Sequence, residues 1–162
     1  MFVPAYCLCW SLLGAGEGPA GPVRVTVVVI LASSAAGPID PALEELAREV
    51  RKREPKLRSF RLAAVEAQSI PVGQQGLFTL VEKQQAQVRI DTSPDARGRV
   101  RLTVSAPGVE QLSYTCVCDK YFPVVTPYRT RNGETLIIAI MAKPCTLTPA
   151  NPPGGERKKA DH

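Results

Sequence analysis

Two runs of consecutive apolar residues limit the folds open to this chain more than any other feature. Residues 25–31 are Val-Thr-Val-Val-Val-Ile-Leu, and residues 136–141 are Leu-Ile-Ile-Ala-Ile-Met. Both runs are rich in β-branched residues, which favour strands. Their apolar residues are continuous rather than alternating, which is typical of strands in the interior of a sheet. We therefore expect residues 25–31 to be buried on both faces and residues 136–141 to lie centrally in a sheet.

A helix is predicted over about residues 40–54. Asp40 can cap it by accepting hydrogen bonds from free backbone amides of the first turn. Pro41 suits the first helical position, and Pro55 ends the helix because the residue before a proline avoids helical geometry. The apolar residues fall on one face at steps of three and four: Leu43, Leu46, Ala47 and Val50.

The rest of the chain predicts strands. Apolar and polar residues alternate over 60–62, 86–105 and 112–118, and the turn residues at 92–98 predict a hairpin within 86–105. Asn132-Gly133 predicts a second hairpin that joins strands near 128–130 and 134–142. The order of elements predicts an α+β fold, with one helix packed on a mostly antiparallel sheet of about six or seven strands.

The ends of the chain differ in composition from its middle. Residues 1–22 are apolar and then rich in small residues, as in a signal peptide or linker. They lack the basic start of a signal, because Arg24 is the first cation. We expect a signal-like segment at 1–22, a single domain at 23–145, a disordered tail at 146–162, and export to the periplasm or outside the cell. No apolar run approaches the roughly 18 residues of a membrane span, so no transmembrane segment is predicted.

Three of the five cysteines lie in the predicted domain, namely Cys116, Cys118 and Cys145. In an oxidising compartment this odd number predicts one disulfide and one spare thiol, whereas in the cytosol all three stay reduced. Cys116 and Cys118 are poor partners for each other because same-face residues on a strand lie about 6.5 Å apart. A bond from one of them to Cys145 is favoured, with buried thiols, or a metal or redox role, as the alternatives.

Histidine chemistry is excluded from the predicted domain, because the one histidine is the terminal His162. A zinc site would have to join Asp119 to the three thiolates, which is a weak ligand set. No paired carboxylates, phosphate-binding loop or nucleophile with an identifiable base stands out. We therefore predict no catalytic residues, no metal site, no cofactor and no enzymatic activity.

The net charge of +5 is concentrated in one short segment. Residues 48–61 carry two acids and seven bases: Arg48, Arg51, Lys52, Arg53, Lys56, Arg58 and Arg61. Such a segment attracts phosphate, acidic polymers or a membrane surface. Arg51, Lys52 and Arg53 are its candidate contact residues, and a solvated helix face is the alternative interpretation.

Two further surfaces are candidates for partner binding. Arg89, Arg99 and Arg101 are expected on the exposed face of one hairpin, where Arg61 could extend them into a stripe for an acidic partner. No aromatic residues are interleaved with them, so specific nucleic-acid binding is not predicted. Residues 121–128 are rich in aromatics and prolines, and Tyr121 and Phe122 are contact candidates because aromatic residues anchor interfaces. A core-covering loop or an edge strand is the alternative for this segment.

Five pieces of residues 25–145 resemble a group of small exported bacterial proteins, familiar from planctomycete genomes, that have no assigned activity. They are Val25-Thr-Val-Val-Val-Ile-Leu-Ala-Ser33, Asp40-Pro-Ala-Leu-Glu-Glu-Leu-Ala-Arg-Glu-Val50, Glu54-Pro-Lys-Leu57 with Phe60, Phe122-Pro-Val-Val-Thr126, and Gly133-Glu-Thr-Leu-Ile-Ile-Ala139 running to Pro144-Cys145. The resemblance implies export and a compact α+β domain, and it implies no site residues.

The sequence favours a non-enzymatic exported domain that binds an unknown protein or an acidic envelope component. Two alternatives stay open. One is a thiol-based redox or metal-binding protein that uses the Cys116-Val117-Cys118 segment. The other is an intracellular polyanion binder, whose affinity would fall steeply with salt.

Overall fold

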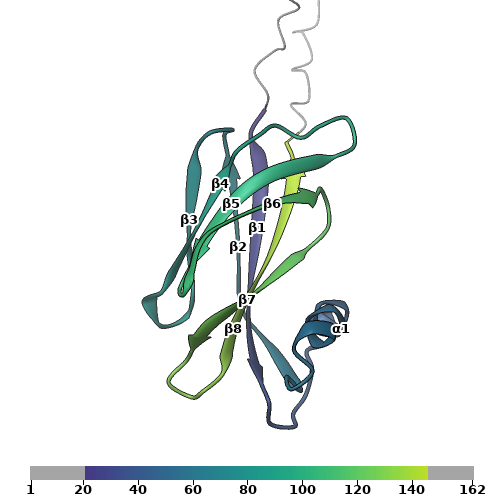
Figure 1. Ribbon diagram of the computed structural model, residues 1–162, viewed down its shortest axis with the longest axis vertical. Coiled ribbons are helices and arrows are strands. Elements are labelled where there is room, and N and C mark those ends of the chain that lie inside the picture. The colour runs from purple at the N-terminus through teal and green to yellow at the C-terminus, as the bar shows by residue number, and fades with distance from the viewer. Residues whose placement is uncertain (1–20, 146–162) are drawn as a thin grey trace, which may run out of the picture.

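The computed structural model describes residues 21–145. In this part the chain forms eight strands, one α-helix and two short 3₁₀ helices (Figure 1). The strands are β1 (Val23–Ser33), β2 (Ser59–Ile70), β3 (Gln75–Thr79), β4 (Gln85–Ile90), β5 (Arg99–Ala106), β6 (Val109–Val117), β7 (Phe122–Arg129) and β8 (Thr135–Pro144). The α-helix α1 spans Glu44–Arg53, directly after the 3₁₀ helix η1 (Pro41–Leu43), and η2 spans Val81–Lys83.

The first sheet contains the two apolar runs as its central strands. Its order is β2-β1-β8-β7, and every pair is antiparallel. Val27 in the middle of β1 lies opposite Glu66 of β2 and Ile140 of β8. The side chains of β1 from Val27 to Ala32 are all buried, so successive residues on both faces are covered. The predictions for both runs are confirmed.

The second sheet is an antiparallel meander in the order β3-β4-β5-β6. Exposed and buried residues alternate along β3 and β4. One face of this sheet is therefore wet and the other packs inward. The hairpin predicted within 86–105 is confirmed as β4 and β5, with Val88 opposite Val104.

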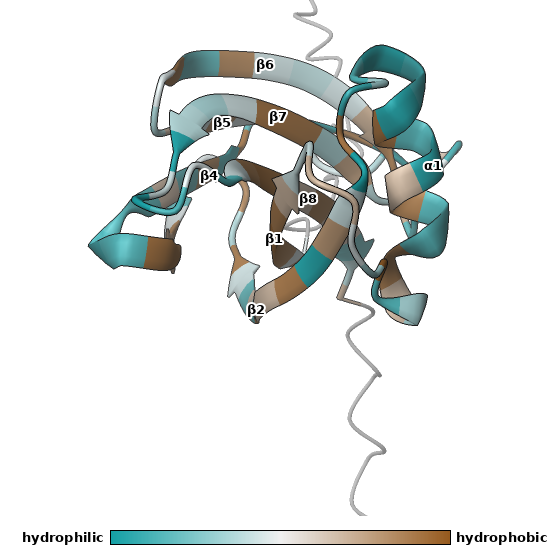
Figure 2. Cartoon of the chain, turned by 90° about the horizontal axis from the view of Figure 1, so that it is seen from below, coloured by the Kyte–Doolittle hydropathy of each residue, from teal (hydrophilic) through white to brown (hydrophobic). Residues whose placement is uncertain are grey.

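Two hydrophobic cores lie on opposite faces of the first sheet. The larger core lies between the sheets and joins side chains such as Val27 and Ile138 to Phe78 and Leu102 of the second sheet. The smaller core lies beneath α1 and includes Val28, Ile30, Ile137, Leu43, Val50 and Phe60. The layers are thus second sheet, first sheet and helix. Figure 2 shows α1 at one side of the sandwich, close to β7, which it contacts.

The predicted helix is confirmed, although its first turn is the 3₁₀ helix η1. The Asp40 carboxylate accepts a 3.0 Å hydrogen bond from the amide of Ala42, and Pro41 opens the turn. Leu43, Ala47 and Val50 are buried against the first sheet, and the helix ends shortly before Pro55. The Asn132-Gly133 hairpin is also confirmed, since it joins β7 to β8.

The prediction of one sheet with six or seven strands is wrong, although the α+β class and the antiparallel pairing hold. The physical reason lies in the central strands β1 and β8. A ten-residue helix covers part of only one face of these strands. Their other face needs a second apolar layer, which the alternating strands β3 to β6 supply as a separate sheet.

Predictions about residues 1–20 and 146–162, which cover the signal-like segment and the tail, lie outside the described residues. Among the described helices, none has the length and apolar character needed to cross a membrane.

Candidate functional site

The edge strand β7 is central to the site, and it contains most of the aromatic segment 121–128. β7 pairs with β8 on one side only, from Phe122 opposite Ile140 to Val125 opposite Ile137. Prolines stand at 123 and 127, and proline is tolerated in a sheet at an edge because it has no N–H to donate. Residues 122–129 of this segment thus form an edge strand, and its role as a contact surface stays a prediction.

The two aromatic candidates differ in their surroundings. Tyr121 precedes the strand and is 42% exposed. Phe122 stacks on Tyr114 of β6, with ring centroids 4.1 Å apart, and packs against the core between the sheets. Tyr121 is thus available for contact with a partner. Phe122 is only partly available, because its ring also packs against the core.

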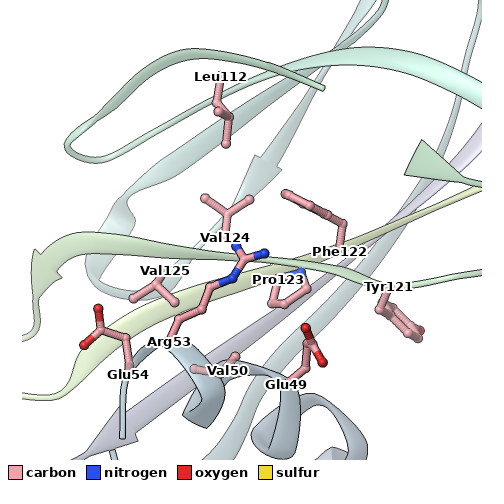
Figure 3. A pocket seen from close by; sticks show the side chains of 10 residues that line it. All are labelled: Glu49, Val50, Arg53, Glu54, Leu112, Tyr121, Phe122, Pro123, Val124 and Val125. Atoms are coloured by element: carbon pink, nitrogen blue, oxygen red, sulfur yellow. The ribbon is translucent and has the colours of Figure 1, made fainter. Parts of the chain in front are cut away.

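A cavity of about 490 Å³ follows β7 between α1 and β6. Figure 3 shows its walls. Pro123 and Val125 face α1, where Val50 lies, and Val124 and Phe122 face the other way, toward Leu112 of β6. The lining residues are Glu49, Val50, Arg53, Glu54, Leu112, Tyr121, Phe122, Pro123, Val124 and Val125. Side chains from both faces of β7 therefore line the cavity along the free edge of this strand.

Two neighbouring cavities extend it along β7. One of about 460 Å³ shares Glu49, Tyr121 and Pro123 with the first cavity and continues toward Lys120. Another of about 310 Å³ shares Glu54 and Val125 with it and continues toward Arg129. The three form one groove along β7, which we call the β7 groove.

The charges that line the β7 groove are not balanced by internal pairing. The cations are Arg48, Lys52, Arg53, Lys120 and Arg129, and the acids are Glu45, Glu49, Glu54 and Asp119. Glu49 pairs with Lys52 at 2.7 Å, which lowers its pKa, and Asp119 lies 3.7 Å from Lys143 outside the groove. Four cations and two acids of this lining have no ion pair within residues 21–145.

The predicted basic residues 51–53 do not act as one patch. All three lie in the last turn of α1, but only Lys52 and Arg53 line the groove. Arg51 is exposed and lies outside the lining. In Figure 3 the Arg53 side chain extends from the helix across to β7.

The predicted arginine stripe lies on the exposed face of the second sheet, apart from the β7 groove. Arg89 pairs with Asp91 at 2.8 Å, and Arg99 pairs with Asp95 at 2.8 Å. Burial opposes ionisation of Asp91, but hydrogen bonds from Thr103 and Arg89 outweigh it and lower the pKa of this carboxyl. Backbone and side-chain hydrogen bonds from Arg99 lower the pKa of Asp95.

Arg101 lies on the same strand as Arg99, and its positive charge also lowers the pKa of Asp91. Arg61 does not extend the stripe, because it belongs to β2 of the first sheet and pairs with Glu134 at 2.9 Å. Much of the positive charge of this surface is therefore neutralised locally.

Cys116, Cys118 and Cys145 are all free thiols, so the predicted disulfide is not formed in this structure. Cys116 points into the core between the sheets, whereas Cys145 lies beside Ser69 of β2, with Sγ 3.7 Å from Oγ. Burial, followed by the neighbouring Cys118, raises the pKa of Cys116 to about 11. Burial also raises the pKa of Cys118, as do Asp119 and Asp95. These thiols are poor nucleophiles at neutral pH.

No group of three or more potential metal ligands occurs within residues 21–145. Comparison with known proteins yields no matching family model, curated protein or solved structure.

Sequence reasoning missed Leu112 and Val50 as groove residues. The pattern placed Val50 on the core face of the helix and Leu112 simply on an alternating strand. Which strand edge lies under which helix depends on the strand order, and no local pattern encodes it. The available signal was the pair of prolines in an apolar strand, which marks an edge.

Proposed function

We propose that this chain is a non-enzymatic binding domain that holds a protein partner in the β7 groove. The observation that carries the proposal is the continuous groove between α1, β7 and β6, with apolar side chains on its floor and charged side chains along its rim. An apolar centre within a polar rim is the usual anatomy of a protein interface. Tyr121 and Arg53 at its border belong to the residue types that anchor interfaces.

Export remains part of the proposal. It rests on the composition of residues 1–22, and an envelope protein outside the cytoplasm is the partner it implies.

The two alternatives have less support. A thiol-based redox function needs a thiolate, and the raised pKa values of Cys116 and Cys118 oppose one. A polyanion binder needs a broad surface of unpaired cations. Arg61, Arg89 and Arg99 are each paired with a carboxylate. The cations of residues 48–58 that have no ion pair within residues 21–145, such as Arg48, Arg51 and Arg53, are what supports this alternative. A polyanion binder would bind heparin at low salt and lose it steeply as salt rises.

Site-specific photocrosslinking in the native cells tests the proposal. A photoreactive amino acid replaces Leu112 or Tyr121 in the β7 groove, or Thr115 on the exposed face of the second sheet as the matched control. We expect both groove positions to form an adduct with the same protein and Thr115 to form none. Absence of adducts from both groove positions, or the same adduct from Thr115, would overturn the proposal.

A further inference from the structure

We infer that the partner enters the β7 groove as an extended acidic segment that pairs with β7 and becomes the fifth strand of the first sheet. This inference rests on the proposed function, and it names the chemistry of the partner and its mode of binding.

The backbone of β7 directs hydrogen-bonding groups into the groove. In an antiparallel ladder, residues alternate between those that bond to the neighbouring strand and those that point away from it. Pro123 has no N–H, so its pair with Ala139 is a non-bonded one, and the next outward residue is Val125, opposite Ile137. The N–H and C=O of Val125 and the C=O of Pro123 therefore face the free edge.

The free edges of β3 and β2 are less open to strand addition than that of β7. The edge of β3 is closed by side chains of β2, because Glu66 accepts a 3.0 Å hydrogen bond from the amide of Thr79 and Gln68 donates to the carbonyl of Leu77 at 2.5 Å. The free edge of β2 is interrupted by a bulge between the partners of Val29 and Ile30. Bulges and inward-pointing polar side chains are common ways to block strand addition. Within residues 21–145, no side chain donates to or accepts from the backbone of Val125.

The walls of the groove fit the alternating side chains of an added strand. Successive side chains of a strand point to opposite faces. On β7 itself, Val125 faces α1 and Val124 faces β6, and a strand laid beside β7 continues both faces. One set of its side chains would meet Val50 and Arg53 of α1, and the other would meet Leu112 of β6.

The charge of the groove selects an acidic segment. Arg53 extends across the groove and has no ion pair within residues 21–145. A guanidinium can bind a carboxylate through two parallel hydrogen bonds. Arg48, Lys120 and Arg129 add positive charge along the rim. Glu49 and Asp119 already have partners, and the two acids that remain, Glu45 and Glu54, are fewer than the four cations without an ion pair within residues 21–145.

A second copy of this chain fits the edge less well. Two β7 edges brought together would each present a proline where the ladder needs a donor, so carbonyls of both copies would lack partners. A segment from another protein without prolines can donate to the carbonyl of Pro123, so only its own carbonyl opposite Pro123 lacks a donor.

A phage-displayed library of random short peptides, selected on the full chain, provides the probe. We expect the enriched peptides to carry Asp or Glu next to β-branched or aromatic residues. A synthetic copy of an enriched peptide should slow hydrogen exchange of the Val125 amide at least about tenfold, since that amide becomes hydrogen-bonded.

Two pairs of variants separate the backbone contribution from the charge. Val125→Pro removes the outward N–H and should abolish peptide binding, whereas Val125→Thr keeps this N–H and should bind more tightly than Val125→Pro. Arg53→Glu should weaken binding about 10- to 100-fold, which is the value of a charge-assisted pair. Arg51→Glu makes the same charge change outside the groove and should have little effect. Thermal unfolding of each variant verifies that it folds.

The outcomes distinguish the inference from the proposed function. Peptides that bind Val125→Pro as tightly as the parent overturn strand addition, and peptides that bind Arg53→Glu equally well overturn the acidic preference. No enrichment, together with a groove-specific crosslink to another protein, overturns the inference and keeps the binding function. A groove-specific crosslink between two copies of this chain favours the second copy instead. No enrichment and no groove crosslink overturn both.

Discussion

At the scale of single residues, Glu82 shows a strained backbone conformation that hydrogen bonds of its own side chain stabilise. Glu82 and Lys83 in η2 have φ values of 52° and 62°, in the left-handed region. This conformation costs a non-glycine residue about 1–2 kcal/mol. The Glu82 carboxylate accepts hydrogen bonds from the Tyr128 hydroxyl at 2.6 Å and the Arg131 amide at 2.9 Å. These bonds fasten the β3–β4 connection to the β7–β8 hairpin.

Replacing Glu82 with Gln should change how stability depends on pH. The hydrogen bonds from Tyr128, and then from Arg131, lower the pKa of Glu82 below its usual 4.5. A carboxyl whose pKa is lower in the folded state stabilises the fold above its unfolded pKa and loses this effect as the pH falls through the folded value. We expect the urea midpoint of the parent to exceed that of Glu82→Gln at neutral pH, with the gap closing below pH 4.5. A gap that does not vary with pH contradicts this account.

The hydroxyl of Tyr114 is a second feature at this scale. It is buried and has no hydrogen-bond partner within residues 21–145, while the ring stacks on Phe122. A buried polar group without a partner is destabilising, so Tyr114→Phe should raise the free energy of unfolding by about 1 kcal/mol. Urea titration measures the change, with Tyr128→Phe as a control that should lower stability because it removes the bond to Glu82. A loss of stability in Tyr114→Phe would show that the hydroxyl is satisfied in solution.

At the scale of elements, the β5–β6 turn supports the strand that forms the groove. Gly108 in this turn has a φ of +76°, and a Cβ there would lie 2.3 Å from Pro127 Cγ of β7. Gly133 has a similar φ of +78°, but a Cβ there would meet no atom within 4 Å. Comparing an alanine substitution at each of the two glycines therefore distinguishes the cost of backbone strain from the cost of a steric clash.

We expect Gly133→Ala to destabilise by about 1 kcal/mol, through the left-handed backbone alone. Gly108→Ala should cost about 3 kcal/mol, because overpacking against Pro127 adds to the same strain. Chemical denaturation of the two variants tests the difference. Equal losses would mean that the turn moves away from β7 without cost.

Local sequence patterns predicted most of these elements but not their arrangement. The capped helix, the hairpin at Asn132-Gly133 and the central strands β1 and β8 each depend on nearby residues. The division into two sheets depends on which strands pair across long distances. The β7 groove brings together Val50, Leu112 and Val125 from three distant segments, so only the marks of an edge strand were visible in the sequence. The cysteine count left a disulfide and buried thiols both open, because it cannot tell that Cys116 points into the core.

At the scale of the whole molecule, the two cores share β1 and β8 but differ in extent. The core between the sheets draws on the inner faces of both sheets, whereas the core beneath α1 depends on a few helix residues, mainly Leu43, Ala47 and Val50. An isolated helix of ten residues is unstable in water, so α1 persists only while it is docked. The wall of the β7 groove that α1 forms should therefore open more readily than the central strands β1 and β8.

Native-state hydrogen exchange in low denaturant should resolve this order. We expect the amides of β1 and β8 to exchange only on global unfolding, because both strands have hydrogen-bonded neighbours on each side and are buried on both faces. The amides of α1 should exchange through a smaller opening with weaker dependence on denaturant. Ala47→Gly, which weakens the helix at a buried position, should speed exchange in α1 and leave β1 nearly unchanged. If the amides of α1 and β1 instead share one opening free energy, the helix and the sandwich unfold as one unit, and the groove wall does not open ahead of the central sheet.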